Sequence, residues 1–154
     1  MNLTEQQVSV FRQSGVLKIP KVFDADEIAA LQAAYAELCT EHVAENIREK
    51  RGGAVRTAMG LHLRHSAFAA LVRDARLVKP ARQLLGTGAL YVQQVKVNVK
   101  AAFDGEAWQW HYDFATHHHE DGVPQPLALN LHVLLDDVTE FNGPLHFIGG
   151  SQSA

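Results

Sequence analysis

The chain has 154 residues, of which 47% are hydrophobic and 20% are charged, a composition that suits one globular domain and excludes a disordered, collagen-like or low-complexity chain. Its formal net charge of -3 excludes a basic nucleic-acid footprint, and no apolar run reaches the roughly 20 residues that span a bilayer. Cys39 is the single cysteine and the N-terminus carries no export signal, so a cytoplasmic location is expected.

The first part of the chain, about residues 1–88, is predicted to be helical. A Thr-x-x-Gln capping box opens a helix at Thr4, and Gly15 ends it. A second capping box opens at Asp24. The apolar spacing that follows it predicts a helix that continues to about Lys50.

Residues 51–60 are polar and contain glycines, which predicts a mobile stretch after this helix. Ser66 is expected to cap a short helix over residues 67–72. Asp74 is expected to cap another helix, and Pro80 inside it predicts a kink or a later start.

The second part, about residues 89–154, changes period. Strict alternation of apolar and polar residues predicts a long strand over residues 91–100, and related patterns predict strands over 127–135 and 145–148. Helices followed by antiparallel strands indicate an α+β fold, or a β-sandwich with a helical layer, in one domain.

The segment WQWHYD places His111 and Asp113 two residues apart. On a strand, such residues point to the same side, so an imidazole and a carboxylate can reach one metal ion. Two histidines and one carboxylate on one face of Fe(II), with the other positions open, form the site of non-haem iron oxygenases. Taken alone, the spacing also fits a structural or surface pair.

Several further segments follow one another in a specific order. They are QVKVNVK, WHYDF, HEDGVP, ALNLHVLLDDVTEFNGPL and FIGGS, within residues 94–151, and LTEQQVSVFRQSGVLKIPKVF lies near the start of the chain. Together they resemble the phytanoyl-CoA dioxygenase family of Fe(II)- and 2-oxoglutarate-dependent oxygenases, and most of all its ectoine-hydroxylase branch. The resemblance covers nearly the whole chain.

This resemblance implies a mainly β fold with N-terminal helices: a double-stranded β-helix, or cupin-like jelly roll, with iron in the mouth of the barrel. It makes His111 and Asp113 catalytic residues and two of the three iron ligands. It also implies Fe(II), 2-oxoglutarate as cosubstrate and O2. The implied reaction hydroxylates an unactivated carbon of a small polar or amino-acid-like substrate.

The same resemblance assigns roles around the two ligands. It places Asn98, Gln94 and Lys100 at the cosubstrate. It places Gln94, His117, Asn130 and Trp110 at the substrate. His117 and Asn130 stand where the ectoine branch has Trp and a small hydroxyl residue, so a substrate other than ectoine is expected. Residues 117–119, three consecutive histidines, are expected on a loop over the site.

The 41 residues after Asp113 contain no arginine. The family supplies a second histidine ligand, and an arginine that pairs with the distal carboxylate of 2-oxoglutarate, from a later part of the barrel. A jelly roll has about eight strands, so this chain is expected to form only the front part of one. His132 or His146 is the alternative source of the missing ligand.

Two other functions stay open. One is a non-catalytic truncated fragment, and the other is a cupin-like module that binds a different metal, such as Zn2+. The expected partner is a small-molecule substrate, without nucleic acid or membrane, and a homodimer is left open.

Overall fold

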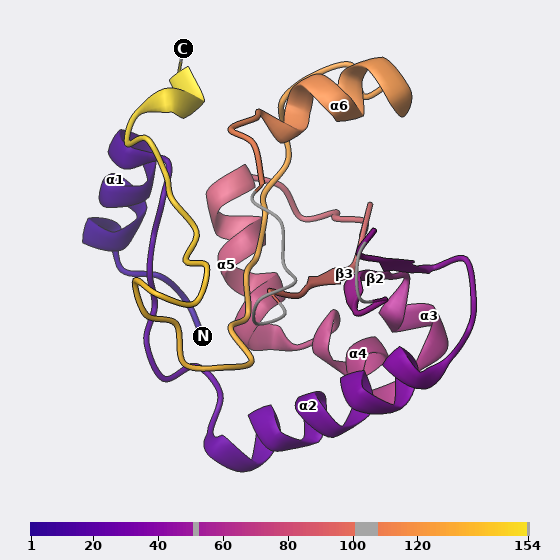
Figure 1. The fold of residues 1–154 in the computed structure, drawn as a ribbon. Helices are drawn as coiled ribbons and strands as arrows, with labels where there is room; N and C mark the ends of the chain where they lie inside the picture. Colours follow the sequence, from indigo (N-terminus) through magenta and orange to yellow (C-terminus); the bar gives the residue numbers. More distant parts are fainter. Residues whose placement is uncertain (51–52, 101–107, 154) are drawn as a thin grey trace.

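The computed structural model describes residues 1–50, 53–100 and 108–153 (Figure 1). No helix in these ranges is long and apolar enough to cross a membrane. In chain order, the elements are α1 (Glu5–Ser14), α2 (Ala25–Thr40), β1 (Asn46–Arg48), β2 (Val55–Met59), α3 (Leu61–Arg64), α4 (Ser66–Leu71), α5 (Ala75–Leu85), β3 (Lys96–Asn98), α6 (Asp113–Glu120) and a 3-10 turn, η1 (Ser151–Ser153).

The starts of α1 and α2 confirm both predicted capping boxes. The backbone N–H of Gln7 donates to Thr4 Oγ1 at 3.2 Å, and the Thr4 N–H donates back to the Gln7 side chain at 2.9 Å. Asp24 and Glu27 exchange the same two bonds at 2.9 and 3.0 Å. Gly15 ends α1 with φ 75°, a left-handed conformation that favours glycine.

The predicted extension of α2 to about Lys50 is wrong, because α2 ends at Thr40. The buried Asn46 accounts for this end. Its side-chain amide donates to the carbonyls of Leu38, at 2.6 Å, and Glu41, at 2.9 Å. These carbonyls lie at the end of the helix, where no following turn supplies N–H groups, and Asn46 gives each of them its shortest hydrogen bond.

A three-stranded antiparallel sheet with the order β1-β2-β3 follows α2. The prediction of a mobile stretch over residues 51–60 is wrong for β2, while residues 51–52 lie outside the described part. Val55, Thr57 and Ala58 of β2 are buried, and Thr57 pairs with Asn98 of β3. The sheet therefore joins the helical part to the start of the predicted strand region.

The hydrophobic core lies where α2 packs against β2 and α4, in the lower part of Figure 1. Its buried members are Leu31, Ala34, Leu38, Val55, Ala58, Leu61 and Phe68. Leu38 and Leu61 are the largest fully buried side chains. The helices α2, α3 and α4 and the strand β2 thus bury a common apolar cluster.

The short helices differ from prediction in detail. The cap of α4 is His65 rather than Ser66, because His65 Nδ1 accepts from the N–H of Ala67 at 3.1 Å. Asp74 caps α5 as predicted, by accepting from the Arg76 N–H at 2.7 Å. The helix begins at Ala75 although Pro80 lies inside it, so the later start is wrong.

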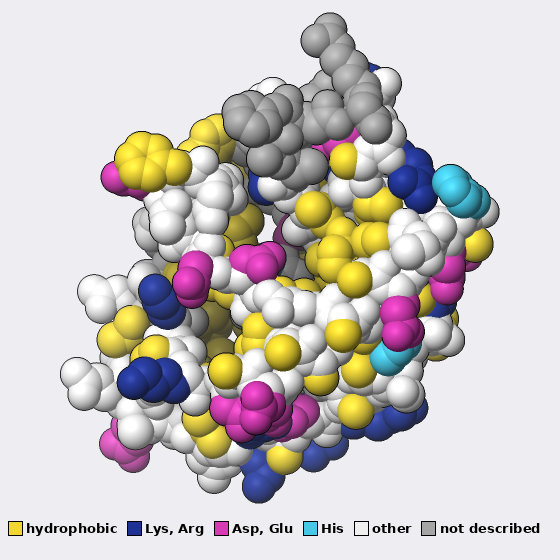
Figure 2. Space-filling model, turned by 60° about the horizontal axis from the view of Figure 1, so that its bottom comes forward, with side chains coloured by type: hydrophobic (Ala, Val, Ile, Leu, Met, Phe, Trp, Pro, Cys, Tyr) yellow, Lys and Arg dark blue, Asp and Glu magenta, His cyan; other side chains and the backbone are white. Residues whose placement is uncertain are grey.

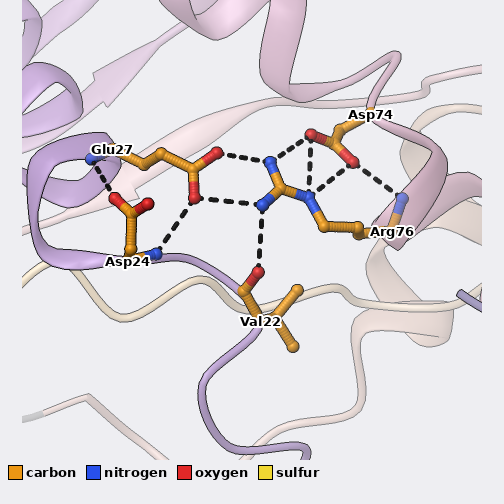
Figure 3. Close-up of polar contacts among 5 residues, drawn as sticks. All are labelled: Val22, Asp24, Glu27, Asp74 and Arg76. Atoms are coloured by element: carbon orange, nitrogen blue, oxygen red, sulfur yellow. Dashed lines mark hydrogen bonds and ion pairs between the residues drawn. The ribbon is translucent and has the colours of Figure 1, made fainter.

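Arg76 ties the start of α5 to the start of α2 (Figure 3). Its guanidinium donates to the carboxylates of Asp74 and Glu27, with shortest distances of 2.6 Å to each, and to the Val22 carbonyl at 3.1 Å. Hydrogen bonds from Arg76 lower the pKa of Asp74 to about 2 and also lower the pKa of Glu27. The capping box of α2 is therefore also part of an ion-pair cluster.

The predicted strands are only partly present. Of residues 91–100, Lys96–Asn98 form β3, and no strand includes residues 127–135 or 145–148. The described part of the chain shows helices and a small antiparallel sheet, and a closed barrel is not among its features. The alternation itself is visible on β3, where Val97 is half-buried between the exposed Lys96 and Asn98.

The segment after α6 runs past α5 and α1 to the C-terminal turn (Figure 1). Gln32 of α2 donates to the Leu135 carbonyl at 2.7 Å. The Gly150 N–H donates to the Ser14 carbonyl at 2.9 Å, and Gln152 Nε2 donates to the Arg12 carbonyl at 3.1 Å. These contacts attach the segment to the helical part at two places.

The view in Figure 2 shows a mixed face, with hydrophobic side chains between acidic and basic ones. Many large apolar side chains of the last third of the chain are exposed, among them Phe141 at 90% and Leu127 at 69%. The early core and this exposed segment therefore differ sharply in burial.

Candidate metal centre

His111 has a fixed hydrogen-bonding state. Its Nδ1 lies 2.7 Å from the backbone carbonyl of Gln109. A carbonyl oxygen only accepts, so Nδ1 carries the proton and Nε2 is the nitrogen with a lone pair when the ring is neutral. A backbone carbonyl on the other ring nitrogen is the usual way in which a metal-binding histidine is oriented. Sequence reasoning did not identify Gln109, which lies only two residues before His111.

Asp113 faces that lone pair. His111 Nε2 and Asp113 Oδ1 are 3.2 Å apart, and both side chains remain partly exposed. Two acceptor atoms repel each other at this distance unless a proton or a metal ion lies between them. Two ligands at right angles on one metal ion, each about 2.1 Å from it, are about 3 Å apart. The pair therefore fits two neighbouring positions of a metal ion.

The local structure that joins these residues is not the predicted strand. His111 lies in an irregular stretch, and Asp113 is the first residue of α6. The two functional atoms nevertheless converge, because the chain turns into the helix directly after His111. The spacing was informative even though the predicted secondary structure was wrong.

The other oxygen of Asp113 also has a partner. The side-chain amide of Asn130 donates to Asp113 Oδ2. Asn130 lies in the irregular stretch after α6, ten residues beyond the end of this helix. The structure therefore brings Asn130 to a predicted iron ligand, which the resemblance did not indicate.

His132 lies near the same carboxylate. Burial lowers the pKa of its ring and the charge of Lys96 lowers it further, while the Asp113 carboxylate opposes the shift. The His132 ring packs edge-on against Phe147, with centroids 6.3 Å apart. His132 thus lies close enough to both Asp113 and Lys96 of β3 for their charges to act on its ring.

The described ranges contain no group of three or more His, Cys, Asp or Glu side chains that could hold a metal ion. Neither His132 nor His146 completes such a group within them. His146 instead lies 6.4 Å from Trp110, between ring centroids. Trp110 itself is 68% exposed. The alternative in which either histidine replaces the missing ligand therefore has no geometric support among these residues.

The residues predicted at the cosubstrate lie on or beside β3. Asn98 Oδ1 accepts from the Thr57 hydroxyl at 3.2 Å, so its amide nitrogen is the atom that can donate to a carboxylate. Gln94 is exposed just before the strand. Lys100 lies just after it, and burial and the neighbouring Arg56 lower the pKa of its amine. The structure brings Asn98 and Lys100 to one edge of the sheet.

Trp108 is anchored to this edge. The Arg56 guanidinium lies 4.2 Å from the centre of the Trp108 ring, and Lys100 Nζ lies 5.7 Å from it. Arg56 Nη1 donates to both oxygens of the buried Glu49 at 3.2 Å. Trp108, at the start of the segment that carries His111 and Asp113, is therefore held against the β1–β2 hairpin. Sequence reasoning did not predict this contact.

His117 lies on α6, not on a loop. Its Nδ1 is 2.8 Å from Asp121 Oδ2, and Gln93 Nε2 is 3.1 Å from the same nitrogen. Hydrogen bonds from His117 and, more weakly, Gln93 lower the pKa of Asp121. The four-residue spacing of His117 and Asp121 was a signal for this helical contact. Gln93 rather than Gln94 joins this pair, because Gln93 Nε2 donates to Asp121 Oδ2 at 3.0 Å.

The model of the phytanoyl-CoA dioxygenase (PhyH) family matches residues 11–154. The chain belongs to this family. This phytanoyl-CoA dioxygenase family member is 43% identical to the L-proline trans-4-hydroxylase of Streptomyces griseoviridis over 144 residues. That alignment covers 94% of this chain and 53% of the relative. It is 39% identical to the ectoine dioxygenase of Bordetella bronchiseptica over 153 residues, which cover 97% of this chain and 49% of that one.

Solved structures agree with this assignment. The crystal structure of EctD from S. alaskensis with 2-oxoglutarate and 5-hydroxyectoine matches with a TM-score of 0.75 and 33% identity, over 80% of this chain and 45% of that chain. EctD with bound Fe matches with a TM-score of 0.70 and 32% identity, over 75% and 42% of the two chains. This family member spans about half the length of the curated relatives that it matches.

Proposed function

We propose that this chain carries His111 and Asp113 as two ligands of the iron in a non-haem Fe(II)- and 2-oxoglutarate-dependent dioxygenase. The observation that carries the proposal is the 3.2 Å approach of His111 Nε2 to Asp113 Oδ1, with Nδ1 held by the Gln109 carbonyl. The relatives named as hydroxylase and dioxygenase support the reaction class. The neighbours solved with Fe and with 2-oxoglutarate support the cofactors.

Iron with 2-oxoglutarate and O2 supplies the chemistry: loss of CO2 from the cosubstrate gives succinate, and one oxygen atom hydroxylates an unactivated carbon of the substrate. The residues of this chain bind and orient. Gln109 holds the His111 ring so that its lone pair faces the metal position. Asp113 adds a negative charge that favours a divalent cation.

We place 2-oxoglutarate at the β3 edge of the sheet. The Asn98 amide nitrogen can donate to a carboxylate there, with Lys100 beside it as a cation and Gln94 at the side that faces the substrate. The third iron ligand and an arginine for the distal carboxylate would come from a segment equivalent to the part of the relatives that this chain does not match. In this proposal, the complete protein is a jelly roll, and this chain supplies the front part of it.

The substrate class is a small amino-acid-like molecule, because the matched relatives are named for L-proline and ectoine. Trp110, His117 and Asn130 are the residues that we place nearest to it. His117 Nδ1 is held by Asp121, to which Gln93 also donates, and this arrangement would present the other ring nitrogen of His117 to a polar substrate. A cytoplasmic location and a homodimer remain predictions.

The test uses this chain and a chimera that continues into the unmatched second half of the Streptomyces griseoviridis relative. Each protein is loaded with Fe(II) and 2-oxoglutarate without O2 and is then exposed to O2. We expect the chimera to form succinate, with a further increase when L-proline is present and a smaller one, or none, with ectoine. His111→Ala and Asp113→Ala should abolish the product. The matched control is His42→Ala, a change of an exposed histidine in the helical part.

Equal succinate formation by the His111→Ala, Asp113→Ala and His42→Ala chimeras would overturn the ligand assignment. Such a result would favour the alternative in which a protonated His111 and Asp113 form an ion pair on the surface and bind no metal.

A further inference from the structure

The two oxygens of Asp113 have different partners. Oδ1 lies 3.2 Å from His111 Nε2, on the side where a metal ion fits. Oδ2 accepts the hydrogen bond from Asn130 Nδ2. Asn130 comes from a different segment, 17 residues later in the chain. The carboxylate is therefore oriented from outside α6, the helix that it starts.

A carboxylate can bind a metal ion through one oxygen or through both. Binding through both requires the two oxygens to turn toward the ion together. An N–H bond on Oδ2 opposes that rotation, because it engages Oδ2 while Oδ1 is the oxygen that approaches His111. Binding through Oδ1 alone keeps one more coordination position open.

We propose that Asn130 is a positioning residue that holds Asp113 as a one-oxygen ligand. This inference rests on the proposed iron site and deepens it. Open positions are what the reaction requires, because the cosubstrate and O2 must both reach the metal. Hydrogen-bonded carboxylate ligands are a general feature of metal sites, and loss of the partner typically lowers metal affinity about 10–100-fold.

The alternative role of Asn130 is direct contact with substrate. The two roles differ in what they require. A substrate contact affects binding of the organic molecule and leaves the metal alone. A positioning contact changes the metal site when no substrate is present.

Local geometry gives Asp113 little other support on the described residues. The cap residue of α6, Tyr112, makes no side-chain cap bond, and the Asp113 side chain is 40% exposed. Packing therefore does not lock this carboxylate in one rotamer. A directed hydrogen bond from Asn130 is the contact that can select the orientation.

The experiment measures binding of Co(II), used as an O2-inert probe for Fe(II), to the chain as it exists. Four proteins are compared with the wild type: Asn130→Leu, Asn130→Gln, Asp113→Asn and Gln125→Leu. Leucine has nearly the shape of asparagine without the donor, and glutamine keeps the amide. Gln125 is an exposed amide in the same segment, and its replacement is the matched control. Far-UV circular dichroism establishes that each variant keeps the helical content of the wild type.

We expect Asn130→Leu to raise the Co(II) dissociation constant about 10–100-fold, whereas Gln125→Leu leaves it unchanged. Asn130→Gln should recover part of the affinity. Infrared difference spectra of the metal-loaded and metal-free proteins give a second readout. The gap between the antisymmetric and symmetric carboxylate bands is wide for one-oxygen binding and narrows when both oxygens bind. It should narrow in Asn130→Leu.

An unchanged dissociation constant and an unchanged band gap in Asn130→Leu, with impaired binding in Asp113→Asn, would overturn the role of Asn130 and leave the iron site intact. Co(II) binding that Asp113→Asn does not alter would overturn the proposed iron site and this inference with it. So would the absence of Co(II) uptake both by the wild-type chain and by the chimera that supplies the second half.

Discussion

The core around α2 and the segment after residue 108, which carries the candidate metal ligands, are built differently. Around α2, residues from four elements bury one apolar cluster, and Ala58 and Leu61 have no exposed surface. In the segment after residue 108, large apolar side chains such as Phe141 and Phe147 are exposed. The described buried apolar residues all precede position 82.

The residues that stabilise the fold are therefore largely different from the residues that would carry out the chemistry. The core holds the hairpin and the helices by packing, whereas single polar contacts orient the candidate metal ligands. Gln109 orients His111, and Asn130 orients Asp113. Changes in the core should therefore act on unfolding, and changes in the ligand segment should act mainly on the site.

The largest expected effect comes from Leu61→Ala. Leu61 is fully buried, and removal of its side chain loses burial and leaves a cavity, so the free energy of unfolding should fall by about 2–5 kcal/mol. Urea unfolding followed by far-UV circular dichroism measures it. The matched change in the other region, Phe147→Ala, removes a side chain that is 55% exposed and should cost less than about 1 kcal/mol. If the two substitutions lowered the free energy of unfolding equally, the core and the exposed segment would not differ in their contribution to stability.

Arg56→Met should cause the next largest decrease in the free energy of unfolding. Its guanidinium lies between the buried Glu49 and the ring of Trp108. Removal of the cation leaves a buried carboxylate without its partner, which typically costs about 1–3 kcal/mol. The double variant with Glu49→Gln should recover part of this loss, since the buried charge is then gone.

Trp108 gives Arg56→Met a second readout, because this contact links the two regions. In a Trp110→Phe background, Trp108 is the single tryptophan. Its fluorescence should become easier to quench by acrylamide when Arg56 is replaced. Unchanged quenching would mean that Arg56 does not hold the ligand segment.

Arg76→Met should lower the stability of the fold above about pH 4.5 and should have progressively less effect as the pH falls below that value. The folded-state pKa of Asp74 is lowered to about 2 and that of Glu27 also lies below its ordinary 4.5, so Arg76 stabilises the fold fully above that value. This stabilisation is lost as the pH falls from 4.5 toward 2. Acid unfolding curves should show a smaller loss of stability over this range in the variant. A curve parallel to that of the wild type would contradict the role of the cluster.

The smallest effect is expected for Thr4→Ala. The substitution removes the oxygen that accepts from Gln7 at the start of α1, a loss typically of about 0.5–1 kcal/mol. Thermal melts measure it, with Thr139→Ala in the exposed segment as a comparison. Thr139→Ala should shift the melting temperature less, because Thr139 accepts only a 3.3 Å bond from the Phe141 N–H in an exposed turn.

The sequence by itself determined the starts of α1 and α2 and the proximity of His111 to Asp113. A capping box needs only residues three positions apart, and Thr4 with Gln7 or Asp24 with Glu27 carry that information locally. His111 and Asp113 are close because they are nearly adjacent in the chain. The family resemblance, which the match over residues 11–154 confirms, also followed from motifs in their order.

The tertiary structure decided what depends on distant partners. Asn46 ends α2 and begins β1 because its amide meets the carbonyls of Leu38 and Glu41. Alternation over residues 127–135 marked two faces, but a strand also needs a neighbour to pair with, and this segment meets α2 through Gln32 instead. Asn130 reaches Asp113 across 17 residues. Hydrogen bonds of this kind join groups whose distance is set by the whole fold, so no local pattern encodes them.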